Sequence, residues 1–140
     1  MSIKVEELMT RSVVSAKPHQ SVEHVRHMLE NNSISAVPVV DSNGHPLGIV
    51  SSTDLARELK PNTPVSHIMT EKVYTVPQYD DTSIAARIMR NHNIHRVVVT
   101  HEQAVVGMLS AFDLLKLVED HRYVAKKAPT PSKRKGSRLK

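Results

Sequence analysis

Two short segments of this chain combine a serine and an aspartate three positions apart, preceded by a glycine and two apolar residues. The candidate side chains are Ser51 with Asp54 and Ser110 with Asp113. Where such a segment joins a strand to a helix, the serine hydroxyl and the outward backbone amides can bind an anion. The carboxylate one turn later can accept hydrogen bonds from the paired hydroxyls of a ribose. The spacing therefore predicts a site for a small molecule that carries a ribose, a phosphate or both.

The same spacing also has a purely structural interpretation. Ser-x-x-Asp is a helix-capping pattern, in which the serine oxygen accepts a hydrogen bond from the third helical amide. An aspartate in the first turn also suits the helix dipole. Capping leaves Gly48 and Gly107 unexplained, because a glycine there is typical of close approach by a ligand or by a neighbouring strand. The sequence alone keeps both interpretations open.

The two segments occupy equivalent places in a unit that is written twice. Leu8-Met9-Thr10 returns as Ile68-Met69-Thr70, and the apolar run at 36–40 is followed by a similar run at 96–100, sixty residues later in both cases. The glycine segments are 59 residues apart, so one residue is missing from the turn before the second of them. This duplication predicts two copies of one supersecondary unit, packed together.

Each copy is predicted to fold as β-α-β-β-α, so the fold class is α/β (α+β) with two tandem units related by pseudo-two-fold symmetry. The predicted strands cover residues 13–15, 37–40, 47–50, 73–76 and 97–99. One predicted helix begins at Ser21, and its counterpart in the second copy includes residues 84–89. The closing helices are predicted from Thr53 to Leu59 and from Phe112 to about His121. The turn at 101–104 lacks the glycine of its counterpart at 41–44, so the two turns should differ. The predicted domains are residues 1–60 and 61–122, followed by a basic tail at 123–140.

Composition argues against several classes of function. The chain has no cysteine, so it can form neither a disulfide nor a thiolate metal site. No apolar run is long enough to span a membrane and no signal-peptide core follows Met1, which favours a cytoplasmic protein. Among nine histidines, the pairs at 24 and 27 and at 92 and 95 lack a further ligand nearby in the sequence. Hydrolase, Walker and dinucleotide-binding motifs are missing as well, so we expect neither a metal site nor an enzyme.

The positive charge belongs to one end of the chain. Seven of the nineteen basic residues lie from Lys126 onward, where no acidic residue occurs, and the rest of the chain holds twelve basic and fourteen acidic residues. This composition is typical of a disordered basic arm. The arm is either a solvated end or a contact for nucleic acid, an acidic partner or anionic lipid. No aromatic residues are interleaved, so stacking on bases is unsupported.

The order and duplication of these motifs resemble the tandem CBS domain pair, also called the Bateman module. The residues that carry the resemblance are Leu8–Thr10, Ile34–Asp41 and Gly48–Leu55 in the first copy, and Ile68–Thr70, Ile94–Val99 and Gly107–Leu114 in the second. They span about residues 3 to 121. Val98 stands where the first copy has Pro38, the proline common in this family, so the main-chain contacts of the two copies should differ.

The resemblance implies clefts between the paired units that hold an adenosine-containing ligand such as AMP, ADP, ATP, NAD or S-adenosylmethionine. It places the ribose hydroxyls on Asp54 and Asp113 and the ribose-phosphate end near Ser51 and Ser110. It lines the adenine pocket with backbone around Ser15, Thr75, Val37 and Val97. His95 and Arg96 replace Ser35 and Ala36 of the first copy, and the forked cation of an arginine suits phosphate. We therefore expect the better nucleotide site at Asp113.

These observations predict a stand-alone regulatory module that needs no cofactor, binds an adenine nucleotide and signals to a partner protein on another chain. By the same resemblance, we expect a homodimer. The alternative is a ligand-free dimerisation scaffold whose basic tail binds nucleic acid or another polyanion.

Overall fold

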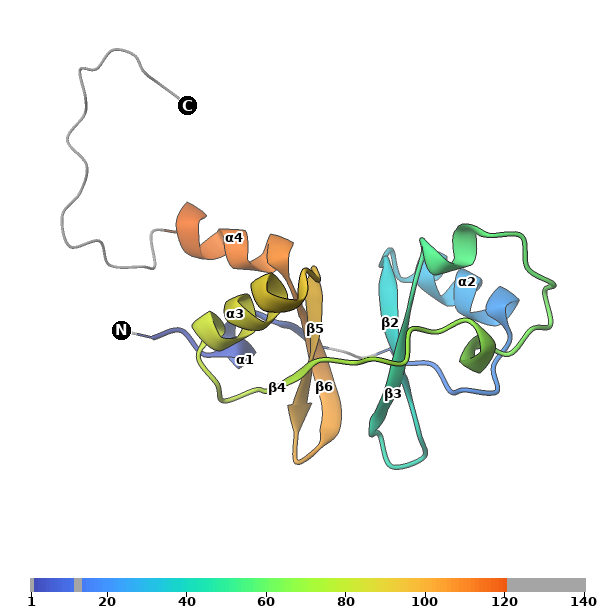
Figure 1. Ribbon diagram of the computed structural model, residues 1–140, viewed down its shortest axis with the longest axis horizontal. Coiled ribbons are helices and arrows are strands. Elements are labelled where there is room, and N and C mark those ends of the chain that lie inside the picture. The colour runs from blue at the N-terminus through green and yellow to red at the C-terminus, as the bar shows by residue number, and fades with distance from the viewer. Residues whose placement is uncertain (1, 12–13, 121–140) are drawn as a thin grey trace, which may run out of the picture.

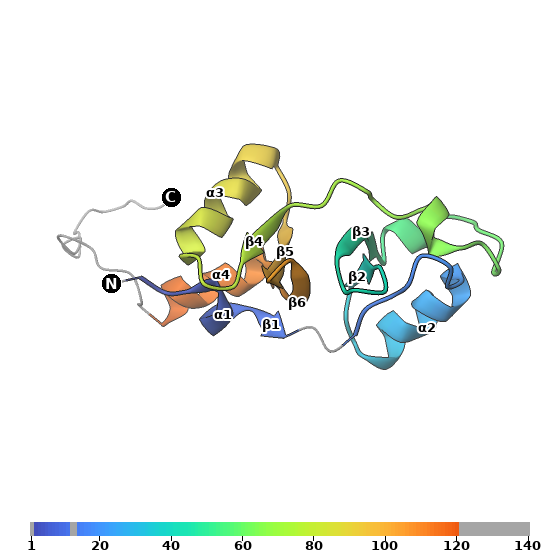
Figure 2. The ribbon, with the colours of Figure 1, turned by 90° about the horizontal axis from the view of Figure 1, so that it is seen from below.

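The protein is described by a computed structural model that covers residues 2–11 and 14–120. Two lobes lie side by side, each with a β-hairpin facing the other lobe and helices on its outer side (Figures 1 and 2). This arrangement confirms the predicted mixed fold of two tandem units. The expectations for residue 13, for the last turn near His121 and for the tail lie outside the described residues.

Among the described residues, the first lobe contains one α-helix and one hairpin, and the second contains three α-helices and four strands. The helices are α1 (Val5–Leu8), α2 (Val22–Asn31), α3 (Thr82–His92) and α4 (Ala111–Glu119), with 3-10 turns η1 (Asp54–Ala56) and η2 (Val65–His67). The strands are β1 (Thr10–Arg11), β2 (Ala36–Val40), β3 (Pro46–Ser51), β4 (Thr75–Pro77), β5 (Arg96–His101) and β6 (Ala104–Ser110). Strands β2 and β3 pair with each other, and the larger sheet has the order β1-β6-β5-β4.

The long helices begin and end as the capping chemistry requires. Ser21 caps α2 by accepting a hydrogen bond from the amide of His24, and Asp81 caps α3 by accepting one from the amide of Ser83. After these helices, Ser33 and Asn93 take left-handed backbone conformations with φ of 52° and 55°. Equivalent turns thus lead each helix into the first strand of its hairpin.

The two hairpin turns differ, as the sequence predicts. In the first, the Asp41 carboxylate accepts hydrogen bonds from the amides of Asn43 and His45, and Gly44 has a φ of 83°. In the second turn, Glu102 and Gln103 take positive φ values of 52° and 71°, although neither is a glycine. Two successive positive φ values are typical of the type I′ hairpin turn.

The segment Met9-Thr10 packs on the second lobe and Met69-Thr70 packs on the first, so the two copies exchange these segments. The sequence pattern does not predict this exchange. Strand β1 does not pair within its own copy but lies against β6, with Thr10 opposite Met108. The equivalent Thr70, sixty residues later, exchanges backbone hydrogen bonds of 2.9 and 3.0 Å with Ile49 on β3. Figure 2 shows β1 and the chain that leads into β4 on opposite sides of the facing hairpins.

Each hydrophobic core therefore draws on both copies. Val65, Ile68 and Met69 pack with the core of the first lobe. Val5, Leu8 and Met9 pack with the core of the second lobe in the same way. Because each lobe needs a segment from the other copy to complete its core, the two lobes are expected to fold as one cooperative unit.

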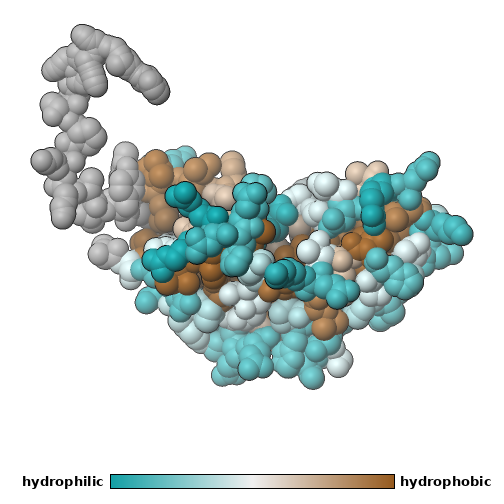
Figure 3. Space-filling view, in the orientation of Figure 1, coloured by the Kyte–Doolittle hydropathy of each residue, from teal (hydrophilic) through white to brown (hydrophobic). Residues whose placement is uncertain are grey.

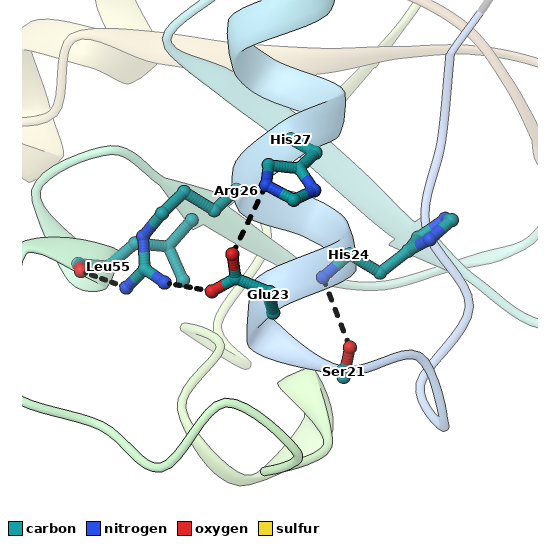
Figure 4. Close-up of polar contacts among 6 residues, drawn as sticks. All are labelled: Ser21, Glu23, His24, Arg26, His27 and Leu55. Carbon is teal, nitrogen blue, oxygen red and sulfur yellow. Dashed lines mark hydrogen bonds and ion pairs between the residues drawn. The ribbon is translucent and has the colours of Figure 1, made fainter.

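The predicted helix over 53–59 is wrong, because the structure has only the 3-10 turn η1 there and Arg57 is already extended, with ψ of 162°. Figure 4 shows Arg26 reaching from α2 to this turn, where its guanidinium donates a 2.9 Å hydrogen bond to the carbonyl oxygen of Leu55. That carbonyl is the one a continued helix would offer to the amide of Leu59. Pro61 further disfavours helical backbone at the residue before it.

Two predicted strands also differ from the structure. Val14 and Ser15 are not in a strand, and Ala16 forms a single parallel bridge with Val39. In the second copy the strand begins two residues later than predicted, as β4, and runs parallel to β5. The closing helix predicted from Phe112 is confirmed as α4, which begins at Ala111.

Candidate functional site

A cleft of about 600 Å³ opens between the two lobes. Its walls come from β1 and Val14, from the turn between α2 and β2, and from the junction of β6 with α4. The lining residues are Thr10, Arg11, Val14, Asn32, Ser33, Ile34, Ser35, Ala36, Pro38, Arg96, Met108, Ser110, Phe112 and Asp113. Both copies contribute, so the site exists only when the lobes are paired.

The motif at the start of α4 forms one polar corner of the cleft. The hydroxyl of Ser110 accepts a 3.0 Å hydrogen bond from the amide of Asp113, and the Asp113 Oδ2 accepts a 2.9 Å bond from the amide of Ser110. This is the reciprocal capping box. Within the described residues, the Oδ1 of Asp113 accepts no hydrogen bond from the protein. One carboxylate oxygen caps the helix, and the other can accept from a ligand hydroxyl.

Arg96 stands at the second polar corner, where the two hairpins meet. It lies opposite Ser110 in the pairing of β5 with β6. Its guanidinium donates a long hydrogen bond of 3.4 Å to the hydroxyl of Ser35, in the other copy. A bond of that length is weak, so an anionic ligand can replace Ser35 as the partner of this cation.

Apolar side chains form another part of the wall. Val14, Ile34 and Pro38 come from the first copy and Met108 from β6. Phe112 follows the Ser110 cap and remains 79% exposed beside the cleft. Apolar side chains combined with polar groups that can fix the orientation of a ligand are typical of a site for a small molecule.

The structure brings three of the predicted site residues to this cleft, namely Arg96, Ser110 and Asp113. Val37 and Val97 are fully buried in the cores, and their neighbours Ala36 and Arg96 line the cleft instead. His95 and Thr75 are exposed. The carbonyl of His95 accepts a 2.7 Å hydrogen bond from the amide of Ala111, at the start of α4.

The remaining predicted residues belong to the first copy and are not among those that line this cleft. Ser51 and Asp54 make the same reciprocal bonds at η1, with the Asp54 Oδ2 accepting from the Ser51 amide at 2.9 Å and from its hydroxyl at 3.0 Å. Ser15 is exposed beside Ala16, which is buried in the first core.

The place equivalent to the cleft in the other half of the pseudo-symmetry contains an aromatic stack. Tyr74 and His92 stand sixty residues after the cleft residues Val14 and Asn32. Their rings stack with centroids 4.1 Å apart, and Lys72 Nζ lies 6.0 Å from the Tyr74 ring. The two halves of the pair therefore differ in the side chains at this place.

Sequence reasoning missed the residues that the exchange and the pairing of lobes bring to the cleft. Thr10 and Arg11 arrive on β1, and Ser35 arrives opposite Arg96. The available signal was the repeat itself, since Ser35 and Ala36 align with His95 and Arg96. A pseudo-two-fold axis between the copies would place such residues near each other.

Two further features are absent from the described residues, namely clusters of metal ligands and membrane-spanning helices. In residues 2–11 and 14–120, no three His, Asp or Glu side chains gather as they would around a metal ion. Figure 4 shows the local partners of the α2 histidines: His27 lies 3.1 Å from Glu23, and the amide of His24 bonds to Ser21. None of the helices in the described chain is long and apolar enough to cross a membrane.

Comparison with known proteins gives the same picture of two units. The model of the CBS domain family matches residues 5–61 and again residues 65–120. The inosine-5'-monophosphate dehydrogenase of Halobacterium salinarum is 35% identical over 108 residues, which are 75% of this chain and 22% of the dehydrogenase. The chain thus spans well under a third of that relative's length.

Two solved structures share the fold. The CBS domain pair of protein MJ0100, in complex with 5-methylthioadenosine and S-adenosyl-L-methionine, superposes with a TM-score of 0.78 at 25% identity, covering 86% of this chain and 99% of the other. The CBS domain of a membrane protein from Sphaerobacter thermophilus superposes with a TM-score of 0.76 at 26% identity, covering 83% and 88%. Both alignments include the lobes on either side of the cleft.

Proposed function

Because the chain belongs to the CBS domain family and carries two tandem units of it, we propose that it is a regulatory module that binds an adenosine-containing ligand in the cleft between its lobes. CBS pairs are typically regulatory and not catalytic, and the enzymes among the relatives match only over a region of this kind. The ligand class is supported by the MJ0100 pair, whose structure contains two adenosyl compounds.

The observation that carries the proposal is the unused oxygen of Asp113. Its partner oxygen accepts a hydrogen bond from the Ser110 amide, so the carboxylate is held in place at one polar corner of a cleft that also has apolar walls. A preorganised acceptor of this kind suits the paired hydroxyls of a ribose. The wall of Val14, Ile34 and Pro38 offers a surface on which a purine can pack.

The composition of the cleft supports one mode of signalling. A ligand there touches β1, the start of β2 and the start of α4, which belong to both copies. Binding would therefore restrain the two lobes relative to each other, and a partner protein that contacts both lobes can sense this. We also propose that the protein is a cytoplasmic homodimer that regulates a partner protein.

Thermal unfolding in the presence of ligands tests the proposal. A compound that binds only the folded protein raises its melting temperature with increasing concentration. We expect such a shift with at least one of AMP, ADP, ATP, NAD, adenosine and S-adenosylmethionine, and a smaller shift in Asp113→Ala. Guanosine nucleotides serve as matched controls. If no adenosine compound shifts the melting temperature at millimolar concentration, the Ser-x-x-Asp motif is only a helix cap here. That result would favour the alternative of a ligand-free dimerisation scaffold whose tail binds polyanions.

A further inference from the structure

We propose that this chain binds one adenosine-containing ligand and not two, because a stacked pair of its own side chains, Tyr74 and His92, occupies the second of two equivalent places. This inference rests on the proposed function and adds the number of ligands per chain. The repeated unit creates two such places, related by the pseudo-two-fold symmetry. One is the cleft that Asp113 lines, and in the other the equivalent carboxylate is Asp54.

The polar end of the second place is built in the same way as that of the cleft. The Asp54 Oδ2 accepts a 2.9 Å hydrogen bond from the Ser51 amide, as the Asp113 Oδ2 does from the Ser110 amide. The segment that carries Thr70 lies beside β3, as β1 lies beside β6. Capping and strand pairing therefore do not distinguish the two places.

Two side chains do distinguish them. Val14 and Asn32 line the cleft, and sixty residues later the chain has the larger side chains of Tyr74 and His92. These two rings stack with their centroids 4.1 Å apart and an angle of 26° between their planes. At that separation the ring faces are in van der Waals contact, which leaves no room for a third ring between them. The stack thus joins the end of α3 to the segment before β4.

A difference in the middle strands fixes the position of Tyr74. The amide of Val98 donates a 2.9 Å hydrogen bond to the carbonyl oxygen of Tyr74. The equivalent residue of the first copy is Pro38, which has no amide hydrogen to donate. On the other side of the stack, His92 is the last residue of α3, and Asn93 after it takes a left-handed conformation with φ of 55°. Hydrogen-bonded backbone therefore carries both rings.

Further contacts hold Tyr74 in the second place. Its side chain packs against the core of the second lobe. Lys72 Nζ lies 6.0 Å from the centroid of its ring, at the limit of cation–π attraction. A ligand that entered here would first have to separate the rings and move Tyr74 off this core. The cleft at Asp113 is already open.

The test converts the second place into a copy of the first. The double variant Tyr74→Val with His92→Asn gives it the side chains of Val14 and Asn32. Calorimetry with adenosine and with AMP measures the number of ligands per chain. We expect one ligand per chain in the wild type and two in the double variant. Adding Asp54→Ala should return the number to one, because this change removes the carboxylate of the second place alone.

A second tyrosine–histidine pair provides the matched control. Tyr79 and His101 pack edge to face with centroids 5.4 Å apart, beyond the end of the paired strands β4 and β5 that is opposite to Tyr74. Tyr79→Val with His101→Asn should keep one ligand per chain. Melting curves verify the folding of every variant.

NMR spectroscopy tests the stack without any ligand. The ring of Tyr74 shields the ring protons of His92 that lie over its face, so Tyr74→Val should shift the His92 resonances downfield. The variant His92→Asn identifies these resonances by their loss, and Tyr79→Val should leave them in place.

The outcomes separate this inference from the proposed function. If the wild type binds two ligands per chain, or loses its one ligand in Asp54→Ala, the blocking role of the stack is refuted while ligand binding stands. A folded double variant that still binds one ligand refutes it as well. If the His92 resonances do not move in Tyr74→Val, the stack itself is refuted. If no adenosine compound binds the wild type or the double variant, the proposed function fails first and this inference fails with it.

Discussion

The carbonyl oxygen of Thr10 lies only 2.6 Å from the point where Gly107 would carry a Cβ. Met9 Sδ is 2.8 Å from the same point, and Gly48 has the equivalent relation to Met69 and Thr70, at 2.7 and 2.8 Å. The glycine that helix capping left unexplained is thus required by a strand of the other copy. The ligand is not needed to account for it.

We predict that Gly107→Ala destabilises the protein by about 1–3 kcal/mol, because the added methyl group must displace backbone. Met9→Ala should not rescue this loss, since the Thr10 carbonyl remains in place. The comparison is Gly44→Ala, where the nearest atom is 3.5 Å away and only the positive φ of 83° is strained. Chemical denaturation measures both variants. A Gly107→Ala protein as stable as wild type, or one fully rescued by Met9→Ala, would contradict the proposed packing.

Asp113 and Asp54 form a matched pair for ligand binding. Each carboxylate accepts a hydrogen bond from the amide of the serine three residues earlier, but of the two only Asp113 lines the cleft. Asp113→Ala should cost about 2–4 kcal/mol of binding free energy, and Asp54→Ala much less. Calorimetry with the tightest adenosine ligand measures both, and melting curves separate binding from the lost cap. Loss of binding in Asp54→Ala alone would reverse the assignment.

Assembly is expected to involve the exposed face of α4. Phe112, Leu115 and Val118 are 79%, 57% and 57% exposed, and Figure 3 shows hydrophobic surface gathered over this helix. We predict a homodimer at micromolar concentration that becomes monomeric in Leu115→Lys, because a charge on an apolar interface is costly to bury. Light scattering decides it: a mass near 15.6 kDa for the wild type would refute the dimer.

Acid should weaken the cap of α3. The amide of Ser83 donates to Asp81 and lowers the pKa of its carboxyl group below the ordinary value. Since the folded pKa is the lower one, this stabilisation is complete above the unfolded pKa of about 3.9 and is lost as pH falls through the folded pKa. Asp81→Asn keeps an oxygen acceptor but cannot titrate, so its melting temperature should fall less between pH 5 and about pH 2. Asp80→Asn, which removes a neighbouring carboxylate that caps no helix, should follow the wild type.

The basic tail gives a prediction for the alternative function. If residues 126–140 bind polyanions, affinity for DNA or heparin should fall steeply with salt and vanish when they are removed. Filter binding at several salt concentrations compares the two proteins. Equal binding by the truncated chain would assign the activity to the lobes.

Much of the local structure could be predicted from the sequence, although the helix expected at 53–59 and the strand expected at 13–15 could not. Apolar spacing predicted α2 and α3, β-branched runs predicted β2 and β5, and the repeat predicted two equivalent units. Capping by Ser110 and the difference between the two turns were readable as well. These features depend on interactions between residues only a few positions apart, so the local sequence is enough to predict them.

The tertiary structure alone decided where the exchanged segments lie and which residues meet in the cleft. Arg11 lies opposite Gly107, and Arg96 reaches Ser35, although 96 and 61 positions separate them along the chain. It also decided that η1 stops after one turn, since Arg26 takes the carbonyl that a longer helix would use. Such contacts depend on how two nearly identical units pair. A repeat predicts that its copies pack together, but it cannot say which copy's strand fills which lobe, because both choices satisfy the same local pattern.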